Sequence, residues 1–249
     1  RFPFVTLPDF ERRVTQTLDQ AQVLSLTYLP IITGAAKSHW EIYSIYKQGW
    51  FEESMAYQQE EQAKRKSVHV DEAGSVAVLA DETAVDGHGK DVQINPVIYR
   101  FNGVEKEPQD GPGPFVPVWQ FSPIIPVSDI INFDMLSHPS HANEGMACMK
   151  YQKRIIGRSF DCSNDTSPEV AGRKSFLNMF LKRWKDGGND YETGPVCDLY
   201  TPIFDQWGEN RTMVGMTMAT VYWQVYFTGV LADNAHIIAV LELSLIHIS

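Results

Sequence analysis

Residues 199–231, LYTPIFDQWGENRTMVGMTMATVYWQVYFTGVL, are the stretch on which the fold assignment depends. Positions 212–232, which begin inside it, are 21 consecutive uncharged residues in a chain whose formal net charge is -10. A helix of about 20 apolar residues is long enough to cross a bilayer. The stretch is therefore either a membrane anchor or part of the core of a globular domain.

The composition of this stretch favours the globular alternative. Polar residues interrupt it, and aromatic residues that prefer membrane interfaces lie near its middle: Thr217, Thr220, Gln224, Thr228, Tyr222 and Trp223. Residues 213–222 alternate in part, as in a buried strand, whereas positions 223, 226, 227 and 230 follow the spacing of a helix face. Because Gly208-Glu209-Asn210 is typical of a turn, we predict strands at 199–205 and 212–222, a helix at 223–231 and a strand at 236–242.

The composition of the whole chain bounds its class. Its 249 residues are 43% hydrophobic and 21% charged, which is typical of a globular protein with a substantial core. The acidic balance argues against nucleic-acid partners, because phosphate contacts need clustered Lys and Arg. The one basic cluster, at 64–66, is predicted to be a solvated helix end.

The three cysteines, Cys148, Cys162 and Cys197, form no Cys-x-x-Cys pair, so they give no support to a zinc or thioredoxin-like site. A Cys162–Cys197 disulfide across the polar residues 161–196 and three reduced cysteines are both open alternatives. Two N-glycosylation sequons begin at Asn164 and Asn210.

Both ends of the sequence predict a piece of a longer protein. The chain begins at Arg1 without Met, and residues 243–249, LSLIHIS, resemble translated sequencing-adapter DNA. We expect these last seven residues to be an artefact and exclude them from the fold.

The amino-terminal third predicts helices. Apolar or small residues recur at spacings of three and four and end before Pro30, at Phe10, Val14, Thr17, Ala21, Leu24 and Tyr28. This pattern predicts a helix of about five turns, either a core-facing helix or a stalk that pairs with a second copy. Further helices are predicted near 40–50 and at 51–65, where Glu52-Glu53 is interpreted as a solvated face and not as a catalytic pair.

The remaining chain predicts two α/β units, at about 68–132 and 145–242. Residues 92–101 and 115–123 are predicted strands, Asn102-Gly103 is a hairpin turn, and 105–114 is a loop. A helix is predicted within 134–149, and another at 173–184 inside the polar insertion.

The search for chemistry finds no nucleophile elbow, phosphate loop, dinucleotide fingerprint or HExxH pair. His138 and His141 would need a third ligand such as Asp134 or Glu144 to hold a metal, and we predict no metal and no cofactor. The same histidines with Asp134 define a hydrolase alternative.

A candidate ligand pocket is formed by aromatic and polar residues at predicted strand ends. Such a mixture suits a small-molecule site, although the same residue types also form ordinary cores. The candidate ligand-binding residues are Trp119, Gln120, Ser122, Tyr200, Asp205, Trp223 and Tyr226. Asp205 is equally suited to capping the turn at 206–210.

Five segments in order resemble the extracellular input region of diatom and other microalgal receptor-type nucleotide cyclases: FPFVTLPDFE (2–11), PVWQFSP (117–123), INFD (131–134), LYTPIFD (199–205) and VYWQVYF (221–227). In that family the region resembles a CHASE-type sensor, in which a stalk helix precedes two PAS-like subdomains. Residues 132–148 resemble the segment that joins the two subdomains.

The resemblance implies an α+β fold with a long N-terminal stalk helix and two PAS-like subdomains built on antiparallel sheets. The expected units are stalk and packing helices (1–66), a membrane-distal subdomain (67–132), a connecting helix with the polar insertion (133–198) and a truncated membrane-proximal subdomain (199–242).

The function implied is extracytoplasmic sensing of an unknown small molecule, at the plasma membrane, by a receptor whose class III adenylate or guanylate cyclase and membrane segments lie outside this sequence. The fragment itself is expected not to be an enzyme. A purely structural ectodomain that forms a homodimer through the stalk is the other alternative.

Overall fold

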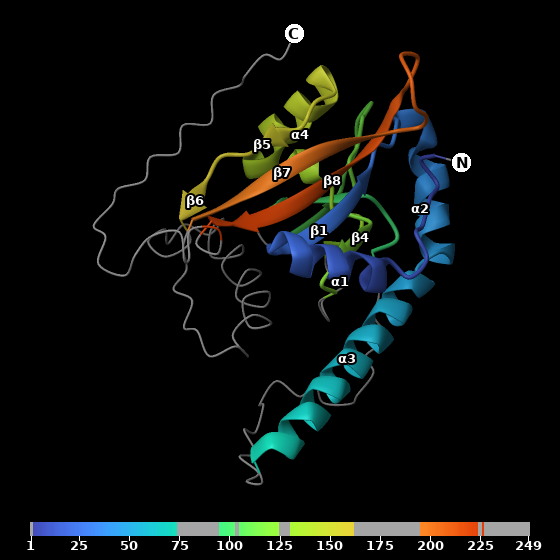
Figure 1. Cartoon of the computed structure of the whole chain (residues 1–249). Coiled ribbons are helices and arrows are strands. Elements are labelled where there is room, and N and C mark those ends of the chain that lie inside the picture. Colours follow the sequence, from blue (N-terminus) through green and yellow to red (C-terminus); the bar gives the residue numbers. More distant parts are fainter. Residues whose placement is uncertain are drawn as a thin grey trace, which may run out of the picture.

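The predicted hairpin is present as strands β7 (Pro195–Phe204) and β8 (Met213–Tyr222), drawn in orange and red in Figure 1. Leu199 lies opposite Ala219 in its antiparallel register. The hairpin belongs to a computed structural model that describes residues 2–73, 95–102, 105–124, 130–161, 195–223 and 226.

Strand β8 pairs with β7 on one side and with β1 (Val23–Pro30) on the other. The first half of the uncharged run is therefore a strand, as predicted. It is the central strand of a sheet, and most of its apolar side chains lie in the core. Trp223 and Tyr226 are helical, while the other residues of the predicted helix 223–231 that follow Trp223, and the strand 236–242, lie outside the described residues. None of the helices in the described part of the chain has the length and hydropathy needed to cross a membrane.

One antiparallel sheet contains most of the strands in the described residues, which confirms the α+β class with antiparallel sheets. Its order is β4-β1-β8-β7-β5, where β4 is Gln120–Ser122 and β5 is Ile155–Ile156, and β6 (Phe160–Asp161) also pairs with β7. The predicted units 1–66, 67–132, 133–198 and 199–242 each contribute to this sheet. The sheet therefore does not follow the predicted division into two subdomains, since strands from all four segments share it.

The predicted helix of about five turns is wrong in its second half. Helix α1 (Phe10–Ala21) ends at Gln22, whose φ of 52° is left-handed, and the chain then enters strand β1. The spacing of three and four residues continues beyond the end of α1 because β1 is buried on both faces. Leu24 and Tyr28 are therefore apolar without the alternation typical of a strand.

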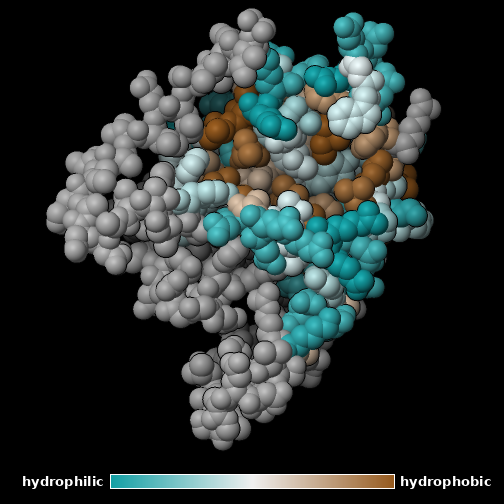
Figure 2. All heavy atoms as spheres, viewed as in Figure 1, coloured by the Kyte–Doolittle hydropathy of each residue, from teal (hydrophilic) through white to brown (hydrophobic). Residues whose placement is uncertain are grey.

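The apolar stripe of α1 is buried in its own domain. Phe10, Val14 and Leu18 are at most 8% exposed and belong to the hydrophobic core. The outward face of α1 is hydrophilic in Figure 2. This stripe is therefore not free to pair with a second copy as a stalk.

Two helices follow β1 as predicted: α2 (Lys37–Tyr46) and α3 (Gly49–Ala73). Trp50 and Phe51 anchor the first turn of α3 in the core. Beyond it α3 extends away from the sheet in Figure 1. Its polar composition suits this exposed course, because a helix without an apolar stripe gains little from packing.

Smaller elements complete the fold. The predicted hairpin at Asn102-Gly103 is confirmed as strands β2 (Tyr99–Asn102) and β3 (Glu105–Pro108), so the start of the predicted loop 105–114 is instead a strand. The predicted helix within 134–149 is a 3-10 turn (Met135–Ser137) followed by α4 (Pro139–Tyr151). The predicted helix at 173–184 lies outside the described residues.

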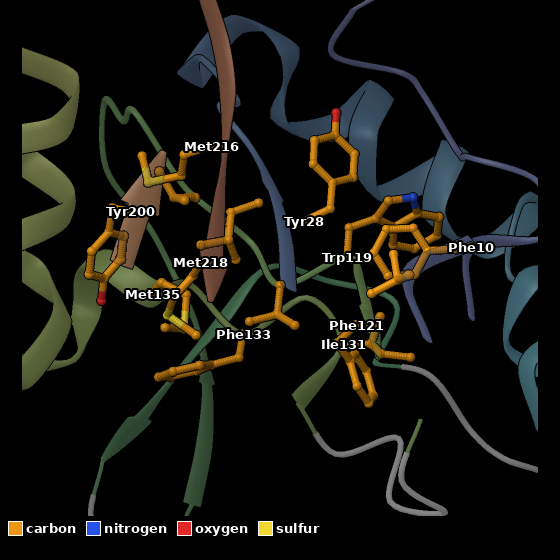
Figure 3. Close-up of a cluster of buried hydrophobic side chains, with 14 of the residues drawn as sticks. Phe10, Tyr28, Trp119, Phe121, Ile131, Phe133, Met135, Tyr200, Met216 and Met218 are labelled. Atoms are coloured by element: carbon orange, nitrogen blue, oxygen red, sulfur yellow. The ribbon is translucent and has the colours of Figure 1, made fainter. Parts of the chain in front are cut away.

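The core lies against both faces of the sheet. Thr27, Phe121, Met218 and Tyr200 are neighbours in the register and therefore share one face. Phe133 and Met135 pack over this face in Figure 3. Helix α1 contacts β1 and β4, and Gln120, on the opposite face from Phe121, bonds to the residues just before α1. The sheet is thus covered on both sides near β4.

Candidate functional site

Two of the predicted ligand residues hold the amino-terminal segment of the chain itself. Gln120 accepts a hydrogen bond from Leu7 N at 2.8 Å through Oε1 and donates one to Leu7 O at 2.9 Å through Nε2. Trp119 Nε1 donates to Thr6 Oγ1 at 3.2 Å. We call residues 4–8 the N-terminal strap. Gln120 and Trp119 are both completely buried, so in this structure the strap occupies the groups that were expected to meet a ligand.

An aromatic cluster stands behind the strap. The rings of Trp40 and Trp50 meet that of Trp119 edge-on, at centroid distances of 5.2 and 5.7 Å. Tyr43 lies 6.0 Å from Trp119 and 5.6 Å from Phe4 of the strap. Such edge-to-face pairs are each worth about 0.5–1.5 kcal/mol beyond their buried area. The cluster therefore gives the strap a rigid wall.

Asn132 fixes this wall to the rest of the core. Its Oδ1 accepts from Trp40 Nε1 at 3.0 Å, while its Nδ2 donates to Ser44 Oγ at 2.9 Å and to Asn95 O at 2.8 Å. Asn132 is fully buried and has a left-handed φ of 66°. Asparagine tolerates this backbone conformation better than most residues, and its amide bonds to three groups on two segments, α2 and the stretch that holds Asn95.

A surface hollow of about 630 Å³ lies between the strap and the junction of α2 with α3. It is lined by Phe4, Val5, Thr6, Pro8, Tyr43, Tyr46, Lys47, Gly49, Trp50 and Glu53. Its volume lies within the range of small-ligand pockets, roughly 300–1,000 Å³, but the hollow is wide open to solvent. Four aromatic side chains and one charge of each sign give the mixed lining that such sites have.

The polar groups of the hollow are partly engaged. Tyr43 shares a 2.7 Å hydrogen bond with Thr6 Oγ1, and burial raises the pKa of its phenol, an effect that this hydrogen bond partly offsets. Glu53 Oε2 accepts from Asp9 N at 3.3 Å. Trp50 is 3% exposed, and its Nε1 has no hydrogen-bond partner among the described residues.

The other predicted ligand residues lie elsewhere. Ser122 is buried on β4, and its hydroxyl has no partner within the described ranges. Tyr200 contacts α4, Asp205 accepts from Thr212 N at 2.8 Å and closes the hairpin turn, and Tyr226 donates to Ala21 O at the end of α1. The seven predicted residues therefore do not line one pocket. Only Trp119 and Gln120 among the seven lie at the strap, and none of the seven lines the hollow.

Trp223 and the cysteines form a separate contact. Burial raises the pKa of the Cys197 thiol to about 11, helped by the charge of Asp198 and opposed by a hydrogen bond with the Trp223 side chain. Cys148 and Cys197 are free and buried. The Cys162–Cys197 disulfide is therefore absent in this structure, although Cys162 itself lies outside the described residues.

The histidines do not form the predicted acid–base pair with Asp134. His141 Nδ1 lies 2.7 Å from the Tyr200 hydroxyl and 3.5 Å from Asp198 Oδ2. Asp134 Oδ1 accepts from Val116 N and Leu136 N, and its Oδ2 accepts from Gln109 Nε2. Burial raises the pKa of Asp134. Among the described residues, the Asp134 carboxylate therefore bonds to two backbone N–H groups and to Gln109, and not to either histidine.

The described residues predicted as alternatives for a metal site or a glycan do not line the hollow. Within the described part of the chain, no group of three or more His, Cys, Asp or Glu side chains is arranged to hold a metal ion. His138 caps α4 by accepting from Ser140 N. Asn210 is exposed in the hairpin turn, and Asn164 lies outside the described residues.

Sequence reasoning missed Thr6, Lys47 and Asn132. The strap and Asn132 lie within quoted segments of the resemblance, but no spacing marks Thr6 or Asn132 as partners of tryptophans 113 and 92 positions away. No known protein-family model matches the sequence, and a comparison with curated proteins finds no match either.

Proposed function

We propose that this chain is the extracytoplasmic, ligand-sensing input region of a membrane receptor, and that the parent protein carries a class III nucleotide cyclase outside this sequence. The fragment then has no catalytic step of its own. It binds a small molecule and passes a conformational shift to the output domain, because a ligand with different affinities for two arrangements displaces their equilibrium.

The strand order is the observation that carries this proposal. Only the strands of this sheet are numbered along the chain here, and β5 and β6 are counted as one interrupted edge strand. Strands β1, β4, β5/β6, β7 and β8 are then first to fifth, and their antiparallel order in the sheet is 2-1-5-4-3. The PAS-like fold that the resemblance implies is likewise built on an antiparallel sheet. We infer a single PAS-like unit formed by this sheet with α1 and α4, in place of the two subdomains that the resemblance implies, since the strands assigned to both lie in one sheet.

The hollow supports the sensing role. Its walls come from two parts of the chain, the strap and the α2–α3 junction. A ligand that touches both walls changes the position of the strap relative to the helices. The strap leads toward the upstream part of the parent, where the resemblance implies a membrane segment, so its position is a signal that such a receptor is able to transmit.

The proposal is tested in the full-length parent, expressed in cells that lack its ligand. Pools of small metabolites are added outside the cells, and intracellular cyclic AMP and cyclic GMP are measured. We expect one pool to change cyclic nucleotide levels, and a parent without residues 1–242 to keep basal synthesis but lose the response. A parent without a cyclase domain, or a response that survives this deletion, would overturn the proposal.

The topology has an independent test at Asn210. Because this residue is exposed, its sequon will be glycosylated when the receptor is made in eukaryotic cells and the region faces the lumen. We expect an endoglycosidase-sensitive mass that Asn210→Gln reduces by one glycan. A receptor without any glycan, whose epitope tag at this region is protected from external protease, would place the region in the cytoplasm.

A further inference from the structure

The two charged side chains of the hollow belong to adjoining elements. Lys47 follows the end of α2, and Glu53 lies one turn inside α3. Both are exposed and both line the hollow. Neither forms an ion pair with any described residue, whereas Lys37 and Lys64 do. The hollow therefore carries one uncompensated charge of each sign.

The backbone strengthens the positive end. Helix α3 begins at Gly49, which also lines the hollow, so the start of this helix lies beside Lys47. The N-terminus of a helix carries a partial positive charge that favours carboxylates. Of the negative side chain, Glu53 Oε2 has one long hydrogen bond from Asp9 N, and Oε1 has no hydrogen bond from the described residues.

Most of the rest of the lining is aromatic and apolar. Phe4, Tyr43, Tyr46 and Trp50 contribute rings, and Pro8 and Val5 complete the wall on the strap side. A ligand with a single charge would be attracted at one end and repelled at the other. A ligand without charge would desolvate Lys47 and Glu53 with no compensation.

We propose that this hollow binds a small zwitterion with an apolar or aromatic body, an α-amino acid being the simplest, with its carboxylate at Lys47 and the start of α3 and its ammonium group at Glu53. This inference rests on the proposed function as a sensor and names the class of its ligand. The bound molecule bridges the strap and the α2–α3 junction, and therefore holds both in one arrangement.

The test is calorimetric titration of the complete chain with L-phenylalanine and with two analogues that each lack one charge. Phenethylamine lacks the carboxylate and 3-phenylpropanoate lacks the ammonium group. We expect L-phenylalanine to bind at least tenfold more tightly than either analogue. Equal binding of all three, or no binding of the zwitterion, overturns the inference.

Charge reversal assigns the two ends. Lys47→Glu is expected to weaken L-phenylalanine at least tenfold and to favour phenethylamine, while Glu53→Lys is expected to favour 3-phenylpropanoate. The matched controls are Lys153→Glu and Glu209→Lys, which reverse exposed charges away from the hollow. Affinities that change equally in the controls would show that net charge is the cause and would refute the site.

The two proposals fail separately. If the full-length parent responds to an external pool while the chain binds no zwitterion, the sensor function stands and the ligand class is wrong. If the zwitterion binds with the expected charge dependence and the parent makes no cyclic nucleotide, the site stands and the cyclase assignment is wrong.

Discussion

The side-chain amide of Gln120 makes hydrogen bonds to both the N–H and the C=O of Leu7, 113 positions away. A carboxamide matches a peptide group in this way because it presents one donor and one acceptor side by side. The pair of bonds sets where the strap ends and where α1 begins. It also makes a sharp prediction, since replacing one atom of the amide removes one of the two bonds.

Gln120→Glu is expected to lower the free energy of unfolding by about 1–3 kcal/mol. The carboxylate still accepts from Leu7 N, but its second oxygen faces Leu7 O without a proton, in a fully buried position. Urea unfolding measures the loss, and hydrogen exchange of residues 4–9 locates it. Gln16→Glu, on the exposed face of α1, is the control. Equal effects at both positions would contradict the role of the Leu7 contact.

Asn132 offers a second prediction, in which two substitutions separate hydrogen bonding from backbone strain. Asn132→Gly keeps the left-handed conformation but leaves Trp40 Nε1 and Asn95 O without this partner, for a loss of about 2–3 kcal/mol. Asn132→Ala is expected to lose about 1 kcal/mol more, because a Cβ disfavours a positive φ. Thermal unfolding compares the two. An alanine variant more stable than the glycine variant would refute the strain component.

Asp134 predicts a pH dependence of stability. Burial raises its pKa in the folded state, so its contribution is complete below the unfolded pKa and is lost as the pH rises through the folded pKa. The substitution Asp134→Asn imitates the protonated side chain, since the amide oxygen accepts from Val116 N and Leu136 N and the amide nitrogen meets Gln109 after that residue's own amide flips.

Asp134→Asn is therefore expected to gain stability relative to the unaltered protein as the pH increases from the acidic range toward neutrality. Urea unfolding across a pH series measures the difference, with Asp110→Asn, an exposed site, as the control. A difference that stays constant with pH, or that changes in the opposite direction, would show that burial does not raise the pKa of Asp134 in the folded protein.

Asp205 distinguishes turn closure from ligand binding. Its Oδ1 accepts from Thr212 N, and its own N–H donates to Thr212 O at 3.0 Å. Asp205→Ala is expected to lower stability by about 1 kcal/mol, while Asp205→Asn, which keeps the acceptor, loses less. Both variants should bind L-phenylalanine like the unaltered chain. A selective loss of binding in Asp205→Ala would return this residue to the candidate site.

The hairpin was predictable from sequence because its signals are local. Gly208-Glu209-Asn210 marks the turn, and partial alternation marks the strand that follows. Strand β1 was not predictable in the same way. A strand buried on both faces has no alternation to show, and its apolar residues happen to extend the helical spacing of α1.

The candidate site depends on contacts between distant positions. Trp119 and Gln120 were recognised as polar and aromatic residues at a strand end, and they do lie beside the hollow's strap. Their partners, Thr6 and Leu7, are 113 residues earlier, and no local pattern relates the two segments. Lys47 and Glu53 are recognisable as parts of one site only because the strap lines the same hollow.

The pairing of β1 with β8 also determines when this protein is able to fold. Val23 lies opposite Val221, so the centre of the sheet joins residues separated by most of the chain. During synthesis β1 and β4 are made before β8. Until β8 has been made, one edge of β1 is unpaired and open to other strands. Such distant pairing makes folding slow. A chain that ends before residue 213 would therefore lack more than the β7–β8 hairpin, since β8 is also the strand that joins β1 to β7 in the sheet.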